Sequence, residues 1–210
     1  MGIKVVLAMG VLMSFPLHGN AAGNAYATLC TNVIAALGNE TTLTSSAFTN
    51  QMQVYLSASN IEARSLAGLA LSISLFSTFE RTLQDNAYDA SCQFCSNVLY
   101  SADLPVRSWQ KSVASVLYAG NLAMDGKYER ARAVCDAGLS VHLASPTTEV
   151  ERTVWSAMAA HDVVPAISIT NALNLCAALS LLVNGESSGL SAYTNGLPPR
   201  AMSKIKMAIE

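Results

Sequence analysis

Residues 112–145 read SVASVLYAGNLAMDGKYERARAVCDAGLSVHLAS, and this stretch decides the fold class of the chain. Two segments with apolar residues at helical spacing stand on either side of the turn-forming pair Asp125-Gly126. A break this short joins two helices as an antiparallel hairpin. The stretch therefore predicts a helical hairpin, which we take as the basic unit of the fold.

The second helix of this hairpin carries a pattern that recurs along the chain. A bulky residue is followed three positions later by a small residue, and four positions after that by a cysteine. The three copies are Tyr88, Ser91, Cys95; Tyr128, Ala131, Cys135; and Ile169, Ala172, Cys176. Offsets of three and four place each set on one helical face. We therefore expect an all-α superhelix, or solenoid, of helical hairpins with a period of about 40 residues.

Residues 112–145 resemble a single tetratricopeptide repeat, and the flanking units resemble it more loosely. The matching positions are small and aliphatic residues on the first helix, a turn glycine, and a tyrosine, an alanine and a small-plus-leucine pair on the second: Ala119, Leu122, Gly126, Tyr128, Ala131, Gly138 and Leu139. Cys135 stands where the family usually has an aromatic residue. The resemblance implies a stack of helices that presents a concave surface to a peptide or a partner protein.

The N-terminus has the features of a secretory signal peptide. Lys4 supplies a positive charge, residues 5–13 are an unbroken apolar run, and small residues lead to Ala22. We expect cleavage after Ala22, which leaves 11 basic and 14 acidic residues and a formal charge of −3. The mature protein is then exported, to a periplasm or to the extracellular space.

Composition excludes two classes of partner. Charged residues make up 12% of the chain, against about 25% in typical soluble domains, and no run of Lys or Arg is present. A weakly acidic chain without a basic patch is a poor ligand for nucleic acid or for anionic membranes. Residues 163–183 carry no charge and are long enough to span a bilayer, but two asparagines near the centre favour a buried core helix.

Helix signals predict the organisation of the chain. Residues 1–22 are the signal, 23–183 a helical-repeat domain, 184–199 an irregular loop and 200–210 a capping helix. Asn60 and Asn86 are predicted N-caps, and Pro105 and Pro165 are predicted first helical residues. The expected helices are 25–37, 44–57, 61–83, 87–100, 105–124, 127–143, 146–161, 165–183 and 200–210.

The cysteines are the main candidates for chemistry. Cys92-Gln-Phe-Cys95 has the spacing of a dithiol redox motif, but no neighbouring cation lowers a thiol pKa and the helix start is too far away. Cys95, Cys135 and Cys176 occupy equivalent places in successive units, so we expect them to be separated by a helix packing distance, about 8–10 Å, as small buried residues. We expect no metal site and no cofactor.

Two further residue pairs complete the set of candidates. Cys30 and Cys92 lie outside the repeated position, and in an oxidising compartment they are the candidate disulfide. Cys92 with Cys95 is the alternative pair. Trp109 and Trp155 are interpreted as packing residues, with a groove-lining role as the alternative.

The leading hypothesis is an exported helical-repeat module that binds a protein or peptide, as an adaptor or assembly factor, without catalysis. One alternative is a structural subunit of a surface assembly, because charge is low and Ala, Ser and Asn are abundant. The other is a thiol-redox protein that uses Cys92 and Cys95.

We predict that alkylation of the denatured, unreduced mature protein modifies at most three of its cysteines, because we expect Cys30 and Cys92 to be joined. Intact mass before and after alkylation counts the thiols. Five modified cysteines would contradict the Cys30–Cys92 disulfide.

Overall fold

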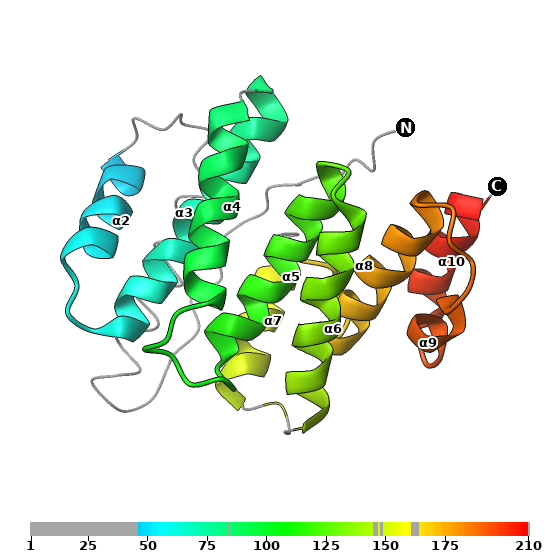
Figure 1. The fold of residues 1–210 in the computed structure, drawn as a ribbon. Helices are drawn as coiled ribbons and strands as arrows, with labels where there is room; N and C mark the ends of the chain where they lie inside the picture. Colours follow the sequence, from blue (N-terminus) through cyan, green and yellow to red (C-terminus); the bar gives the residue numbers. More distant parts are fainter. Residues whose placement is uncertain (1–45, 84, 145–146, 148, 161–163, 210) are drawn as a thin grey trace. The chain divides into compact units, whose positions relative to one another are not determined.

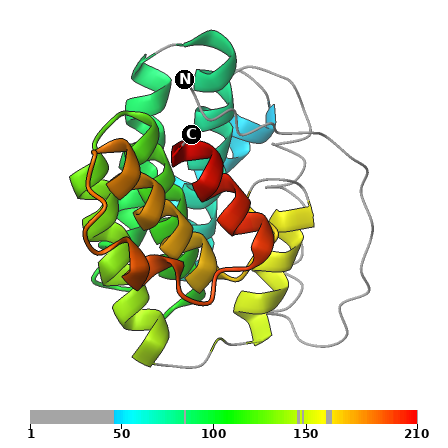
Figure 2. The ribbon, with the colours of Figure 1, turned by 90° about the vertical axis from the view of Figure 1, so that its right-hand side faces the viewer.

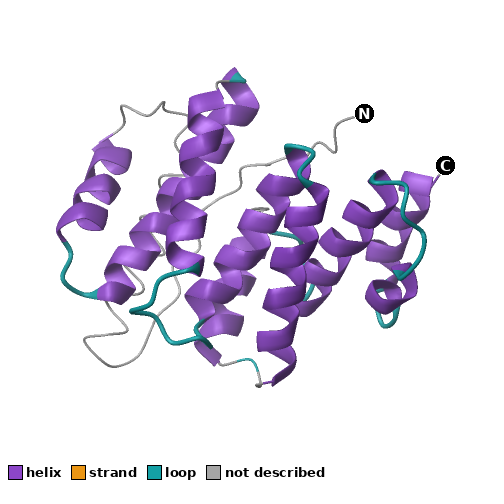
Figure 3. Ribbon diagram, in the orientation of Figure 1, coloured by secondary structure: helices purple, strands orange, loops and turns teal. Residues whose placement is uncertain are grey.

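The computed structural model describes residues 46–83, 85–144, 147, 149–160 and 164–209 of the chain. Within these residues every regular element is an α-helix, which confirms the predicted all-α class (Figure 3). The signal segment and the predicted helix 25–37 lie outside the described residues.

The described residues divide into two compact units. The N-terminal unit contains α2 (Ser46–Ser57), α3 (Ile61–Thr82) and α4 (Asp85–Leu99). The C-terminal unit begins at Val106, and its helices are α5 (Trp109–Met124), α6 (Tyr128–Ala144), α7 (Glu149–Ala160), α8 (Ile169–Val183), α9 (Leu190–Thr194) and α10 (Pro199–Ile209) (Figure 1).

In the N-terminal unit α3 packs against both α2 and α4. A helix enclosed on two sides must be apolar around most of its circumference. Accordingly, its buried residues follow one another closely: Leu66, Ala67, Leu69, Ala70, Leu71, Ile73 and Leu75. Asn60 caps the helix as predicted, because its side chain accepts a hydrogen bond from the Glu62 amide at 2.8 Å.

In the C-terminal unit α5 and α6 form the predicted hairpin. Gly126 in the connection has a φ of 74°, a left-handed conformation that glycine adopts without strain. Helix α8 then packs against both members of the hairpin. The hairpin plus α8 is therefore the three-helix core of this unit.

Helix α6 lies close to both of its neighbours at Gly138. A Cβ atom added there would lie 3.0 Å from Leu173 Cδ1 on α8 and 3.0 Å from Ser115 Oγ on α5. Arg132, nearer the start of α6, donates to Glu186 beyond the end of α8 at 2.7 Å. Helices α6 and α8 thus run antiparallel, and a residue without a side chain allows their close contact.

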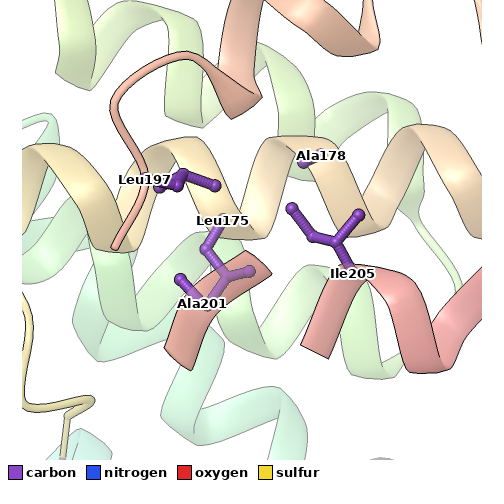
Figure 4. Close-up of a cluster of buried hydrophobic side chains, with 5 residues drawn as sticks. All are labelled: Leu175, Ala178, Leu197, Ala201 and Ile205. Carbon is purple, nitrogen blue, oxygen red and sulfur yellow. The ribbon is translucent and has the colours of Figure 1, made fainter. Parts of the chain in front are cut away.

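Helix α10 covers α8 on the far side from this contact region, and Figures 1 and 2 both show the two helices side by side. Leu175 and Ala178 of α8 pack with Ala201 and Ile205 of α10, joined by Leu197 (Figure 4). The segment predicted as an irregular loop, 184–199, contains the short helix α9, so that prediction was wrong in part. A helix is present at Pro199–Ile209, close to the predicted 200–210.

Three predicted helix starts were wrong. Pro105 and Pro165 each precede their helix by four residues, and Ser108 and Ser168 are the N-caps of α5 and α8. The side-chain oxygen of each serine accepts a hydrogen bond from a backbone N–H of the first turn. Proline has no side-chain oxygen and cannot cap a helix in this way. Asn86, a predicted cap, lies inside α4.

The two misplaced starts share one local pattern. Leu104 and Val164 precede the prolines, and Trp109 and Ile169 follow the serine caps; all four are buried. In both cases the short segment from the proline to the serine cap is held at its two ends by a buried apolar residue, one before the proline and one at the first position of the helix.

We predict that Gly138→Ala lowers the free energy of unfolding by about 1–3 kcal/mol, because Leu173 and Ser115 are buried and cannot move away from the new methyl group. Gly120→Ala, in α5, is the matched control: nothing lies within 4 Å of its added Cβ, so it should be about 0.5–1 kcal/mol more stable. Urea unfolding measures both. Equal stability of the two variants would contradict the tight contact at Gly138.

Candidate functional site

A buried ion pair lies at the start of the C-terminal unit. Arg107 precedes the N-cap of α5, and its guanidinium makes two parallel hydrogen bonds to Glu151 of α7: Nη1 to Oε1 at 3.1 Å and Nη2 to Oε2 at 2.9 Å. The Glu151 side chain is 1% exposed and that of Arg107 is 18% exposed. Removal of either partner would leave a charge in a poorly hydrated place, which is costly.

His142 of α6 completes the cluster. Its Nδ1 lies 3.1 Å from Nη1 of Arg107, and its Nε2 lies 3.5 Å from Oε1 of Glu151. Burial lowers the pKa of His142, the Arg107 charge lowers it further, and Glu151 opposes them. The ring is therefore neutral near pH 7, with Nδ1 accepting from Arg107 and the Nε2–H directed at Glu151.

The cluster is closed by Ser112 on α5. Its hydroxyl oxygen accepts from Nη1 of Arg107 at 3.0 Å, and the same hydroxyl donates to the Ser108 carbonyl at 3.1 Å. The Arg107–Glu151–His142 cluster thus links the segment before α5 with α6 and α7. The side chains of the cluster bond to one another. The cluster therefore acts as a non-covalent cross-link between these segments, and its His142 responds to pH.

The N-terminal unit contains a second buried polar group, formed by Ser72, Ser91 and Cys95. Ser91 Oγ donates to the Ser72 carbonyl at 2.8 Å, and Ser72 Oγ lies 3.0 Å from the Ser91 carbonyl and 2.8 Å from Cys95 Sγ. Burial raises the pKa of Cys95 to about 12. At neutral pH this cysteine is a thiol, whereas dithiol redox chemistry needs a thiolate.

The structure contradicts one prediction about the repeated cysteines. Cys135 and Cys176 were expected to be held apart, but the two thiols interact between α6 and α8, and each shifts the pKa of the other. Helix axes 8–10 Å apart still bring two side chains together when both point into the interface, and Gly138 brings these helices close. Cys135 is fully buried and Cys176 is half-buried.

The other repeat-core residues are mostly where the pattern predicted. Tyr88, Ser91, Ala131, Ile169 and Ala172 are buried, and Tyr128 is half-buried. Cys95 lies in the N-terminal unit and the other two cysteines in the C-terminal unit, so the stacking of all three copies stays a prediction.

Trp109 and Trp155 are buried, 7% and 6% exposed, so they are packing residues and not the lining of a surface groove. The Trp155 indole donates to the Ile167 carbonyl at 2.6 Å, which ties α7 to the segment before α8. Of the candidate disulfide, Cys92 is half-buried on α4, and Cys30 lies outside the described residues.

Two large apolar side chains are exposed beside the Arg107–Glu151–His142 cluster. Val106 and Leu143 are the chain neighbours of Arg107 and His142, and they are 73% and 77% exposed. Sequence periodicity missed these two residues, because the link between their segments depends on the contact between Arg107 and His142.

In the part of the chain that the structure describes, no three His, Cys, Asp or Glu side chains gather where a metal ion could be held. None of the described helices combines the length and the apolar character that crossing a membrane requires. Comparisons with protein-family models, with curated proteins and with solved structures find no match to this chain.

We predict that stability falls as the pH falls through the region where His142 becomes charged. The folded-state pKa lies below the ordinary value near 6.5, so the unfolded chain binds the proton first, and stability present above that pH is lost below it. Unfolding in urea at about pH 7.5 and about pH 5.5 measures the loss for the wild type and for His142→Gln.

The His142→Gln variant should lose less stability between these pH values than the wild type, although it is less stable at the higher one. A parallel loss in both proteins would contradict the assignment of this pH dependence to His142.

Proposed function

We propose that this chain is an exported helical module that binds a protein or peptide partner, as an adaptor or assembly factor. Its N-terminal segment has the composition of a signal peptide, and its helical hairpins resemble tetratricopeptide repeats in sequence. Helical hairpins of this kind offer stable surfaces on which side chains can be presented to a partner.

The observation that carries this proposal is the exposed pair Val106 and Leu143. A single exposed apolar residue is ordinary, but each of these two is the chain neighbour of a residue in the Arg107–Glu151–His142 cluster. The cluster with Glu151 holds the segment before α5 and the end of α6 in fixed positions. A preorganised apolar surface loses less conformational entropy when a partner binds to it.

Self-assembly is the second candidate, and a different pair of residues favours it. Val183 near the end of α8 and Met207 near the end of α10 are 52% and 75% exposed, and these two helices lie side by side. They would supply an apolar contact for a second copy. The free face of α10 also carries Lys204 and Lys206, and like charges on facing copies would oppose a close contact there.

The redox alternative has less support. Cys95 is fully buried, and burial raises its pKa to about 12. Its short contact is with the Ser72 hydroxyl, and Cys92 lies on the same helix three residues away, so the Cys92–Cys95 pair is poorly placed for dithiol exchange.

We predict that Val106→Asp with Leu143→Asp weakens partner capture at least tenfold, since each aspartate would have to be desolvated in the contact. The measurement is affinity capture from the native cell envelope or secreted fraction, followed by a direct titration of the captured protein. Val183→Asp with Met207→Asp is the matched control: it adds the same charges at other exposed apolar residues of the unit and should bind like the wild type.

Circular dichroism must show equal helicity for all three proteins. If both double variants bind like the wild type, the Val106–Leu143 surface is not the binding site. If the wild type elutes as a large oligomer in size-exclusion chromatography and the Val183–Met207 variant as a monomer, self-assembly replaces the adaptor proposal.

A further inference from the structure

Two cysteines lie near the close contact of α6 with α8 at Gly138. Cys135 lies three residues before Gly138 on α6, and Cys176 lies three residues after Leu173 on α8. A Cβ atom at Gly138 would lie 3.0 Å from Leu173 Cδ1, so the two helices are close together here. Because α6 and α8 run antiparallel, the two cysteines face each other one turn away from that contact.

The thiols of this pair interact directly. Each thiol shifts the pKa of the other, and the Cys176 backbone carbonyl accepts a hydrogen bond from Ser180 Oγ at 2.8 Å. The surroundings are fully packed, since Ala131, Cys135 and Leu173 have no exposed surface. Two thiols in such contact need a small movement of their side chains to form a bond.

We propose that Cys135 and Cys176 are a redox modification site, which closes to an intramolecular disulfide between α6 and α8. This assignment is independent of the proposed partner binding. The oxidant is a disulfide, either that of a thiol–disulfide oxidoreductase or a small-molecule one such as oxidised glutathione. Both are oxidants of the compartments that exported proteins enter.

The order of the two steps follows from the asymmetry of the pair. Cys176 is half-buried whereas Cys135 has no exposed surface, so Cys176 is the more accessible of the two, and its interaction with Cys135 lowers its pKa. The Cys176 thiolate attacks one sulfur of the oxidant, forms a mixed disulfide and releases the first oxidant thiolate. Cys135 then gives up its proton and attacks the Cys176 sulfur.

The mixed disulfide breaks in this second step, and the other oxidant thiolate leaves. Two protein thiols are thereby oxidised, the oxidant is reduced to two thiols, and the protons of the protein thiols go to the two leaving thiolates. Cys135 is suited to the second place, because the hydrogen bond with Cys176 and burial raise its pKa and keep it protonated until the mixed disulfide is in place.

The bond would change the mechanics of the C-terminal unit. It closes a loop that contains all of α7, which is otherwise attached through the Arg107–Glu151–His142 cluster and Trp155. A cross-link restricts the unfolded chain, so the oxidised protein resists denaturation more than the reduced one.

The chain offers a built-in comparison in Cys95. It is as buried as Cys135, but its short contact is with the hydroxyl of Ser72 and its own helix carries the nearest cysteine, Cys92. Two cysteines three residues apart on one helix are poorly oriented for a disulfide. Cys95 should therefore stay a thiol when Cys135 and Cys176 are oxidised.

The test is a peptide map of the full chain. The reduced protein is treated with oxidised glutathione, remaining thiols are alkylated after denaturation, and the chain is digested with trypsin. Arg132, Arg152 and Arg200 delimit two successive tryptic peptides, 133–152 and 153–200, which carry Cys135 and Cys176 as their single cysteines. We expect these two peptides to be recovered as one disulfide-linked species, lighter than their sum by two hydrogens.

Variants and a stability measurement complete the test. Cys176→Ser should abolish the linked species and leave Cys135 alkylated, whereas Cys95→Ser should form it like the wild type. The oxidised wild type should have a higher denaturation midpoint than the reduced one, and dithiothreitol should reverse the shift. The proposal would be overturned if both peptides were recovered in alkylated form. It would also be overturned if either peptide were linked to another cysteine or to a second chain. The peptide map of the wild type is sufficient to detect each of these outcomes.

Discussion

The C-terminal unit depends on the close approach of α6 to α5 and α8 at Gly138. One face of α6 carries Ala131, Cys135, Gly138 and His142 at spacings of four, three and four residues. The glycine lets the neighbouring helices come near, and the same approach brings Cys135 to Cys176 one turn away. It also sets His142 against Arg107 one turn in the other direction. One packing constraint thus places both polar features of this unit.

The Arg107–Glu151–His142 cluster gives α7 a position that its own apolar surface does not provide. Burial of a charged pair costs several kcal/mol of desolvation per ion, which only good geometry and further hydrogen bonds recover. Here both carboxylate oxygens, a ring nitrogen and a serine hydroxyl meet the guanidinium. The arrangement therefore selects one placement of α7 against α5 and α6, and it leaves Val106 and Leu143 exposed at its edge.

Sequence periodicity predicted much of this fold and less of the candidate sites. Helical spacing and the Asp125-Gly126 turn were sufficient for the α5–α6 hairpin, because a glycine with positive φ and two amphipathic segments are local properties. The starts of α5 and α8 were misplaced, since proline is favoured at a first helical position and a serine cap outweighs that preference here. The sequence did contain a signal for the true starts, because both helices are preceded by a proline and, three residues later, by the serine that caps the helix.

The sequence by itself determined that the chain is helical and that Ser91, Cys95, Ala131, Cys135 and Ala172 are interior residues, because apolar periodicity and small side chains report on burial directly. Tertiary structure alone decided which buried groups meet. Residues 35 and 44 positions apart form the ionic cluster, and 41 residues separate the paired thiols. Such contacts depend on which helix packs on which face at what distance, and a periodic pattern in the sequence carries no information about that distance.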